Sequence, residues 1–278
     1  MKLTPRDLRL LKLLANYGVL STHQIEKFVF NSIATTTVLR RLRVLERANL
    51  LKRIIGLESY ELLWMLTAEG GRTAKVAVSK SKWGKNMLEH DHKLVGLRIA
   101  LEVSGISHSW TPEHEIRSFI VRKHGIKNMK DRIVPDAFMG ISVNGFKHSV
   151  AIELELTLKN KTKIRKTLSR YIEKGKFHAL WYVAPKKSIL DSVWRQWLSL
   201  GGQSSGIIFY ASLLPEVMEN AIKARLMGTK PHRVIEQIWN QKSVLEAAQV
   251  VSRQNKIKNE SINDVNQDYH APLLQETG

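Results

Sequence analysis

The sequence predicts an α+β protein: an N-terminal winged helix-turn-helix followed by a mixed-sheet α/β domain. Three helical patterns and a strand hairpin occupy roughly the first 75 residues. From residue 86 to residue 213 the patterns follow the order α-β-β-β-α-β-α-β, which is typical of helices packed on a mixed sheet. The chain has 278 residues, 43% of them hydrophobic, so it can form one or two domains with apolar cores.

Helix signals are clear at the N-terminus. Thr4 can cap a helix that begins with Pro5, whose missing N–H costs nothing there, and Gly18 can end that helix. Ser21 begins a second helix, with Gln24 three residues later to complete a capping box. We therefore expect two short helices in succession.

A third helix is expected from about Ser32 to Ala48. Its apolar face is Leu39, Leu42 and Leu45. The other faces carry Thr36, Thr37, Arg40, Arg41, Arg43 and Arg47. Two strands then flank a turn at residues 56–59, and Thr67 starts a short helix. In a winged helix the third helix reads the major groove of double-stranded DNA and the hairpin is the wing. The alternatives are a solvated arginine-rich surface or a winged helix that binds protein.

The second part of the chain begins after a basic segment, Val76–Lys85, which we interpret as a linker or a DNA-facing loop. A long helix over Asn86–Val103 carries His90, Asp91 and His92 near its start. Three strands, a basic helix, a strand, a helix and a final strand are expected next. The three strands cover His108–Arg117, Arg132–Val143 and His148–Leu158, with Asn144-Gly145 as a hairpin turn, and the basic helix runs from Lys161 to about Lys174.

The third of these strands carries two carboxylates on one face. Glu153 and Glu155 share that face because side chains alternate along a strand, and the other face is apolar: Val150, Ile152, Leu154 and Leu156. Carboxylates at that spacing repel each other unless a cation lies between them. Asp136 follows Pro135 on the neighbouring strand, so three carboxylates can converge as an all-oxygen site suited to Mg²⁺ or Mn²⁺. The alternative is that Glu153 and Glu155 decorate a solvent-facing sheet.

The C-terminal part is expected to be helical from Pro215 to about residue 254, and residues 255–278 are expected to be disordered because they are polar and poorly periodic. The expected domains are therefore residues 1–75, residues 86–213 and a helical extension at 214–254, followed by that tail.

Composition narrows the class of partner. Lys and Arg number 44 against 25 Asp and Glu, and the resulting formal charge of +19 favours a polyanion, above all nucleic acid. The chain has no cysteine, which excludes disulfides, zinc ribbons and thiol chemistry. No apolar run approaches the length of a membrane span. We expect a cytoplasmic protein without membrane insertion.

Two resemblances follow from these motifs. Pro135-Asp136 and then Glu153-Leu154-Glu155 on consecutive strands resemble the PD-(D/E)xK nuclease superfamily over about residues 86–213. Glu155 stands at the usual lysine position, so Lys159 or a lysine of the next helix would have to substitute. The order winged helix, HDHKLVGLRIAL, VPDAF, AIELELT and a basic helix ending in Tyr171 resembles the replication-relaxation family, which includes MobC-type relaxases of mobilisable plasmids.

The resemblance implies a restriction-endonuclease-like α/β domain and a relaxase that nicks double-stranded DNA at a plasmid transfer origin. Accessory mobilisation or coupling proteins would be its partners. Asp136 and Glu153 would hold Mg²⁺ or Mn²⁺ against the scissile phosphate. Glu155 would be a third ligand or would orient the attacking water. Further candidates for the metal shell are Glu89, Asp91 and Glu113.

Other residues take subsidiary roles in this hypothesis. Lys159 is a candidate catalytic cation, and His90 and His92 are candidates for phosphate contact or proton transfer. Tyr171 is a candidate covalent nucleophile, with ordinary helix packing as the alternative. A basic cluster beside the carboxylates is expected to contact DNA: Lys159, Lys161, Lys163, Arg165, Lys166 and Arg170.

Two other functions fit the same residues. The first is a non-catalytic winged-helix DNA-binding regulator or replication initiator whose α/β domain serves dimerisation. The second is a restriction or transposition endonuclease that cuts both strands. Metal binding that depends on Asp136 distinguishes a nuclease from a regulator, and nicked rather than linear plasmid distinguishes a relaxase from the double-strand endonuclease.

Overall fold

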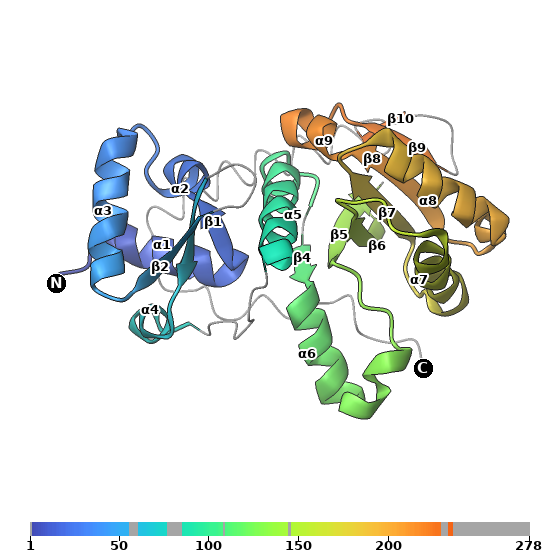
Figure 1. Ribbon diagram of the computed structural model, residues 1–278, viewed down its shortest axis with the longest axis horizontal. Coiled ribbons are helices and arrows are strands. Elements are labelled where there is room, and N and C mark those ends of the chain that lie inside the picture. Colours follow the sequence, from blue (N-terminus) through green and yellow to red (C-terminus); the bar gives the residue numbers. More distant parts are fainter. Residues whose placement is uncertain are drawn as a thin grey trace. The chain divides into compact units, whose positions relative to one another are not determined.

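A computed structural model of the chain describes residues 2–55, 61–76, 85–107, 109–143, 146–228 and 233–235. Two compact units are present, residues 1–96 and residues 97–278 (Figure 1). Among the described helices, none is long and apolar enough to cross a membrane. The expected turn at 56–59, most of the basic segment Val76–Lys85, the Asn144-Gly145 turn and the C-terminal tail lie outside the described residues.

The first unit has the element order of a winged helix. Its three-stranded antiparallel sheet has the order β1-β3-β2, and the described helices surround it (Figure 1). The short strand β1 was not expected, and it pairs with β3 through Leu20 opposite Trp64. The elements are α1 (Pro5–Tyr17), β1 (Val19–Ser21), α2 (Thr22–Val29), α3 (Thr35–Arg47), β2 (Leu51–Ile55), β3 (Leu62–Leu66) and α4 (Ala68–Ala74).

Both predicted helix starts are confirmed. The Thr4 hydroxyl accepts a hydrogen bond from Asp7 N at 3.2 Å, and the Asp7 carboxylate accepts from Thr4 N at 2.7 Å. At α2 the same exchange joins Ser21 and Gln24, with distances of 3.2 and 2.8 Å. Reciprocal caps of this kind satisfy two of the free N–H groups at a helix start.

The apolar face of α3 differs by one position from the expected face. Val38, Leu42 and Leu45 are fully buried, whereas Leu39 is only partly buried. The spacing of four and then three residues keeps these three side chains on one side of the helix. As a result the opposite side of α3 is polar and exposed.

The second unit is built on a seven-stranded mixed sheet of order β10-β9-β8-β7-β6-β5-β4. Strands β6, β7 and β8 run parallel, and the remaining neighbours are antiparallel. Helix α5 (Lys85–Val103) reaches into both units. The other elements are β4 (Ser109–Pro112), α6 (Glu113–His124), η1 (Ile126–Asp131), β5 (Ala137–Val143), β6 (Phe146–Leu154), α7 (Lys161–Lys174), β7 (Ala179–Ala184), α8 (Lys187–Ser199), η2 (Gly202–Ser204), β8 (Ile208–Leu213), α9 (Leu214–Asn220), β9 (Arg225–Gly228) and β10 (Arg233–Val234).

Helices α7 and α8 cover one face of this sheet, as Figure 1 shows. They connect parallel strands, as crossover helices do. The core between them and the sheet is aromatic: Trp197 and Phe209 lie 5.1 Å apart between ring centroids, and Tyr182 stacks on Phe209 at 5.8 Å. Residues from every second position of β6, β7 and β8 point into this core, which fixes the rotation of each strand.

Two predictions of secondary structure were wrong. The strand expected over His108–Arg117 ends at Pro112, and a helix, α6, follows it. The helix expected after Pro215 ends at Asn220, and residues 225–228 form strand β9, which lies between β8 and β10. Residues 236–254 of the expected helical extension lie outside the described residues. Pairing with β8 overrides the helical preference of these residues. Gly228 lets β9 approach β8 closely, because a Cβ at this position would lie 2.0 Å from the carbonyl oxygen of Phe209. The sheet therefore continues past residue 213.

Candidate active site and nucleic-acid interface

The expected carboxylates gather where the hairpin of β5 and β6 meets strand β7. Ala137 is opposite Ile152 in the register, so Asp136 lies just beyond the end of β5, near Glu153. The Asp136 carboxylate accepts a hydrogen bond from Leu154 N at 2.7 Å. Asp136 also accepts at its carbonyl from Glu113 N at 3.0 Å. These bonds end the β5–β6 ladder and fix the position of Asp136.

Glu153 points toward helix α7. It shares the sheet face of Ala151, which is fully buried under that helix. The hydroxyl group of Tyr171 on α7 donates a short hydrogen bond to Glu153 Oε1. Glu153 itself is only partly accessible, and Glu155 is 7% exposed. The alternative of a solvent-facing sheet surface is therefore wrong.

Glu155 extends the line of strand β6 by one residue. Its N–H donates to the carbonyl of Val183 on β7 at 2.9 Å. Its carboxylate accepts from Lys159 Nζ at 2.6 Å, and the Lys159 side chain is half exposed. The lysine that the sequence offered as a substitute thus lies beside the carboxylates, with one side open to solvent.

The pKa values of Glu153 and Lys159 are both shifted from their ordinary values. Burial raises the pKa of Glu153 to about 8, and the negative charge of Asp136 adds to the effect, whereas Tyr171 and Lys159 oppose it. Burial alone would lower the pKa of Lys159, but its bond to Glu155 and the charges of Glu153 and Asp136 raise it. Lys159 is therefore a fixed positive charge, and Glu153 exchanges its proton near neutral pH.

A divalent cation fits this cluster only in part. No group of three or more His, Asp or Glu side chains among the described residues is arranged to hold a metal ion. The expected cage of Asp136, Glu153 and Glu155 is therefore not formed, because Glu155 is turned to Lys159. Asp136 and Glu153 remain as a closely spaced acid pair. Mg²⁺ is commonly bound by one or two carboxylates together with water and substrate phosphates, so the pair suits that mode.

The hypothesis that Tyr171 is a covalent nucleophile is not supported. Tyr171 is 2% exposed, packs against Phe177 with 5.3 Å between ring centroids, and gives its proton to Glu153. Burial raises its pKa well above the ordinary value, and the nearby charge of Glu153 adds to this. A buried neutral phenol cannot reach a phosphodiester, so Tyr171 is a structural neighbour of the carboxylates.

Tyr182 is a further neighbour of the carboxylates and was not predicted from the sequence. Tyr182 on β7 is the register partner of Glu153 and is 3% exposed. Burial raises its pKa, followed by the charges of Glu153, Glu155 and Asp136. The alternation of HALWYVA places Tyr182 on the face of Leu180, and that pattern was visible in the sequence. Its nearness to Glu153 depends on the pairing of β6 with β7, which was not visible in the sequence.

The candidates on α5 lie in the first unit. His90 Nδ1 is 3.3 Å from the carboxylate of Asp91, and His92 Nε2 is 3.9 Å from that of Glu61. Burial lowers the pKa of His92, so this side chain is neutral at pH 7. The proposed roles of His90, Asp91 and His92 in the metal shell or in proton transfer stay predictions.

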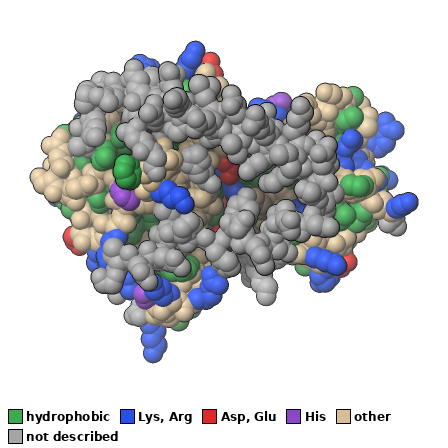
Figure 2. All heavy atoms as spheres, turned by 180° about the vertical axis from the view of Figure 1, so that it is seen from behind, with side chains coloured by type: hydrophobic (Ala, Val, Ile, Leu, Met, Phe, Trp, Pro, Cys, Tyr) green, Lys and Arg blue, Asp and Glu red, His purple; other side chains and the backbone are tan. Residues whose placement is uncertain are grey.

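Helix α3 presents the expected polar face. Its exposed side chains include Thr36, Thr37, Arg40, Arg43 and Arg47. These positions repeat at three and four residues, so most of them share one side of the helix. Lys and Arg side chains are visible along the edge of the molecule where α3 lies (Figure 2).

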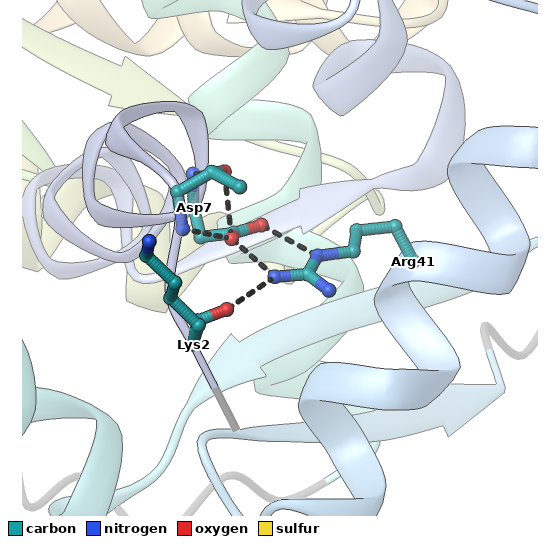
Figure 3. Close-up of polar contacts among 4 residues, drawn as sticks. Lys2, Asp7 and Arg41 are labelled. Carbon is teal, nitrogen blue, oxygen red and sulfur yellow. Dashed lines mark hydrogen bonds and ion pairs between the residues drawn. The ribbon is translucent and has the colours of Figure 1, made fainter.

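Arg41 is different from its neighbours on α3. Its Nε donates to the Asp7 carboxylate at 2.9 Å, a second nitrogen makes a shorter bond to the same group, and that nitrogen also lies 3.4 Å from the Lys2 carbonyl (Figure 3). Asp7 is 1% exposed. The expectation that Arg41 contacts DNA is therefore corrected: its guanidinium joins α3 to the start of α1.

The basic helix α7 also divides into two groups of side chains. Arg165 donates to Ser199 Oγ at 2.7 Å and to Gln196 at 3.3 Å, which ties α7 to α8. Arg170 donates to the carbonyl of Arg132. Lys161, Lys163 and Lys166 are exposed, and their contact with DNA stays a prediction.

The chain can be compared with solved structures, with curated proteins and with protein families. A solved structure described as the restriction endonuclease FokI bound to DNA is similar over 77% of this chain and 43% of that chain, with 13% identity. The TM-score of this match is 0.26. None of the curated proteins matches. The sequence pattern of the family described as replication-relaxation matches residues 11–179, more than half of the chain and including α3, Asp136, Glu153, Glu155 and Tyr171. The chain belongs to the replication-relaxation family.

Proposed function

We propose that this protein is a DNA endonuclease of the relaxase type, which nicks one strand at a plasmid transfer origin with Mg²⁺ or Mn²⁺ as cofactor. The observation that carries the proposal is the grouping of Asp136, Glu153 and Glu155 with Lys159 at one end of the sheet. A half-buried acid pair beside a partly open lysine is an arrangement suited to a metal-dependent phosphodiester-cleaving site. Membership of the replication-relaxation family supports a role in DNA processing.

Each residue has a distinct task in this proposal. Asp136 and Glu153 would hold the cation, which lowers the pKa of a bound water and stabilises charge on the phosphate. Lys159 would contact the scissile phosphate, since its ammonium group is half exposed and keeps its proton. Glu155 would hold Lys159 in place through the 2.6 Å ion pair. Tyr171 would fix the orientation of Glu153.

The polar face of α3 would bind the origin in the major groove. Thr36, Arg40 and Arg43 are exposed and are suited to reading base edges and phosphates. Coupling or accessory mobilisation proteins would act with this chain at the origin.

A plasmid assay tests the proposal. Purified protein is incubated with supercoiled plasmid carrying the cognate origin, with Mg²⁺, Mn²⁺ or EDTA. Nicked circles should form only with a divalent ion, and Asp136→Ala and Glu153→Ala should reduce nicking by at least about a hundredfold while DNA binding persists. Asp191→Ala is the matched control, because Asp191 lies on α8 outside the candidate site and its carboxylate pairs with Lys187 at 2.9 Å.

The outcomes separate the competing functions. Wild-type nicking by both site variants would contradict the assignment of the site. Linear rather than nicked product would indicate a double-strand endonuclease instead of a relaxase.

One observation favours a second candidate function, a non-catalytic DNA-binding regulator or replication initiator. The described residues form no three-ligand metal group, and Glu153, with a pKa of about 8, is mostly protonated at pH 7. Titration of Mn²⁺ distinguishes the two functions. Binding that is lost in Asp136→Ala supports the nuclease, and absence of binding supports the regulator.

A further inference from the structure

A helical projection inserted between β4 and β5 is not used by the proposed chemistry. It consists of α6 and η1, residues 113–131, and we call it the α6–η1 arm. Figure 1 shows α6 leaving the sheet at β4, with η1 at its far end. Only Ile116 and Ile120 of α6 are buried, so most of the helix surface is open.

The arm is strongly basic beyond its first three residues. Residues 116–130 contain five Lys or Arg residues and no Asp or Glu. Arg122, Lys123 and Lys127 are exposed, and Figure 2 shows Lys and Arg side chains at the tip of the projection at the lower edge of the molecule. Cations in the last turn of a helix are favoured by the helix dipole, which accounts for Arg122 and Lys123. Lys127 lies beyond the end of α6 and has no such explanation.

An apolar side chain stands at the turn of the arm. Ile126 is 74% exposed and follows Gly125, which has a φ of 77° and ends α6. Covering this side chain with the apolar surface of a partner would be favourable by about 2 kcal/mol. Proteins that bind the minor groove of DNA place an apolar side chain beside Lys and Arg in this way.

The first residue of the arm is hydrogen-bonded to the candidate active site, and the segment that follows the arm is bonded to α7. The N–H of Glu113, the first residue of α6, donates to the carbonyl of Asp136 at 3.0 Å. At the returning end, Arg170 of α7 donates to the carbonyl of Arg132. The arm is therefore attached to the segment that carries Asp136, so a ligand bound by the arm is held close to that segment.

We propose that the α6–η1 arm is a second DNA-binding element, which contacts duplex DNA beside the cut, with Arg122, Lys123 and Lys127 on phosphates and Ile126 against the minor groove. This inference depends on the proposed nuclease function in one respect only, namely that the cut lies at Asp136. Helix α6 has 12 residues, which gives a length of about 18 Å at about 1.5 Å per residue. At about 3.4 Å per base pair, the contacts lie about five base pairs from Asp136.

An anionic membrane is the other polyanion that a basic surface can bind. A membrane-surface helix buries a continuous apolar face, whereas Ile116 and Ile120 of α6 are 2% and 8% exposed because they pack on the protein. Ile126 alone contributes only about 2 kcal/mol of burial, which is too little for stable membrane attachment. Duplex DNA is therefore the favoured partner.

A salt titration measures the phosphate contacts of the arm. Binding of the full chain to a fluorescein-labelled mixed-sequence duplex of about 30 base pairs is followed in EDTA, so that no cleavage occurs. The variant with Arg122→Ser, Lys123→Ser and Lys127→Ser should lower the slope of log K against log salt by about 2 to 3. The matched control is Lys147→Ser, Lys176→Ser and Lys223→Ser, which removes the same charge from exposed sites of the same unit. Its slope should change by less than about 1.

A cross-linking experiment locates the contact. The chain has no cysteine, so Ile126→Cys creates a single thiol to which a photoactivatable cross-linker can be attached. Phe146→Cys is the control, because Phe146 is 72% exposed at the far end of the β5–β6 hairpin from Asp136. Position 126 should cross-link to the duplex, and position 146 should not.

Three results would overturn the proposal: equal slopes for the two triple variants, equal cross-linking at positions 126 and 146, or protection of the thiol at position 126 by phosphatidylglycerol vesicles but not by DNA. If the arm fails these tests while Asp136→Ala abolishes nicking, the nuclease function stands without the arm. If Asp136→Ala still nicks while position 126 cross-links, the arm stands and the proposed site is wrong.

Discussion

The surroundings of Glu153 oppose its ionisation. It lies under α7, its register partner is the buried Tyr182, and Asp136 faces it across the hairpin. Its pKa of about 8 in the folded chain stands above its ordinary value of 4.5. The folded protein therefore keeps a proton that the unfolded chain releases. Stability from this group is full below about pH 4.5 and is lost as pH rises through about 8.

Glu153→Gln should remove that pH dependence. Gln keeps an oxygen that can accept from Tyr171 but does not titrate. The free energy of unfolding of the wild type should fall from pH 5 to pH 8 relative to that of the variant, by at most about 1.4 kcal/mol per pH unit. Urea denaturation of both proteins at the two pH values measures it. Parallel pH profiles would show that Glu153 is not perturbed in this way.

Two adjacent arginines of α3 have opposite roles. Arg41 is bound to the buried Asp7, and Arg40 is exposed. Removing one partner of a buried ion pair leaves an uncompensated charge, which is costly. An exposed arginine without such a partner contributes little to stability.

Arg41→Ala should therefore lower the free energy of unfolding by about 3 kcal/mol. Arg40→Ala should leave stability within about 0.5 kcal/mol and weaken DNA binding instead. Thermal unfolding and duplex binding of the two variants provide the test. Equal loss of stability in both would contradict the assigned roles.

At the level of elements, α7 combines packing and exposure. Ile164, Leu168 and Tyr171 are buried against the sheet, and Arg165 joins α7 to Ser199 at the end of α8. Lys161 and Lys163 lie at the exposed start of the helix, which is capped by Asn160. The helix thus supports Glu153 from one side while offering cations on the other.

Substitutions on α7 should separate its contribution to DNA binding from its contribution to stability. Lys161→Ser with Lys163→Ser should reduce the salt slope of DNA binding by about 2 without lowering the melting temperature. Arg165→Ala should lower the melting temperature by a few degrees, since about 1 kcal/mol of hydrogen bonding to α8 is lost. Calorimetry and anisotropy titrations on each variant report the two effects separately.

At the level of the whole molecule, the two compact units have separate cores. The first unit buries Trp64, Leu42 and Ile25, and the second buries Trp181, Trp197 and Phe209. Units with separate cores can unfold in separate steps.

We expect two calorimetric transitions, of which Arg41→Ala shifts only one. The affected transition is that of the first unit, because Asp7 and Arg41 both lie in it. A single transition that moves as a whole would show that the units unfold cooperatively.

The sequence by itself determined the local features of the fold. Thr4, Ser21 and Thr67 mark helix starts through contacts within three residues, and apolar periodicity places α1, α2, α7 and α8. Alternation along β6 identified its apolar face, Val150 to Leu154, and put Glu153 and Glu155 together on the other. These features depend on neighbours along the chain, so they can be predicted from it.

The sequence did not determine which strands and helices meet. The helix expected after Pro215 became strand β9 because β8 offered it an edge, and α6 was missed although Ile116 and Ile120 had helical spacing. Arg41 was expected to contact DNA because its partner Asp7 is 34 residues away. For Tyr171 the sequence left both a nucleophile and ordinary helix packing open, because its burial against Glu153 depends on contacts between distant residues. Tertiary structure decided these roles, since burial and charge pairing between distant residues set the energy of an ionisable side chain.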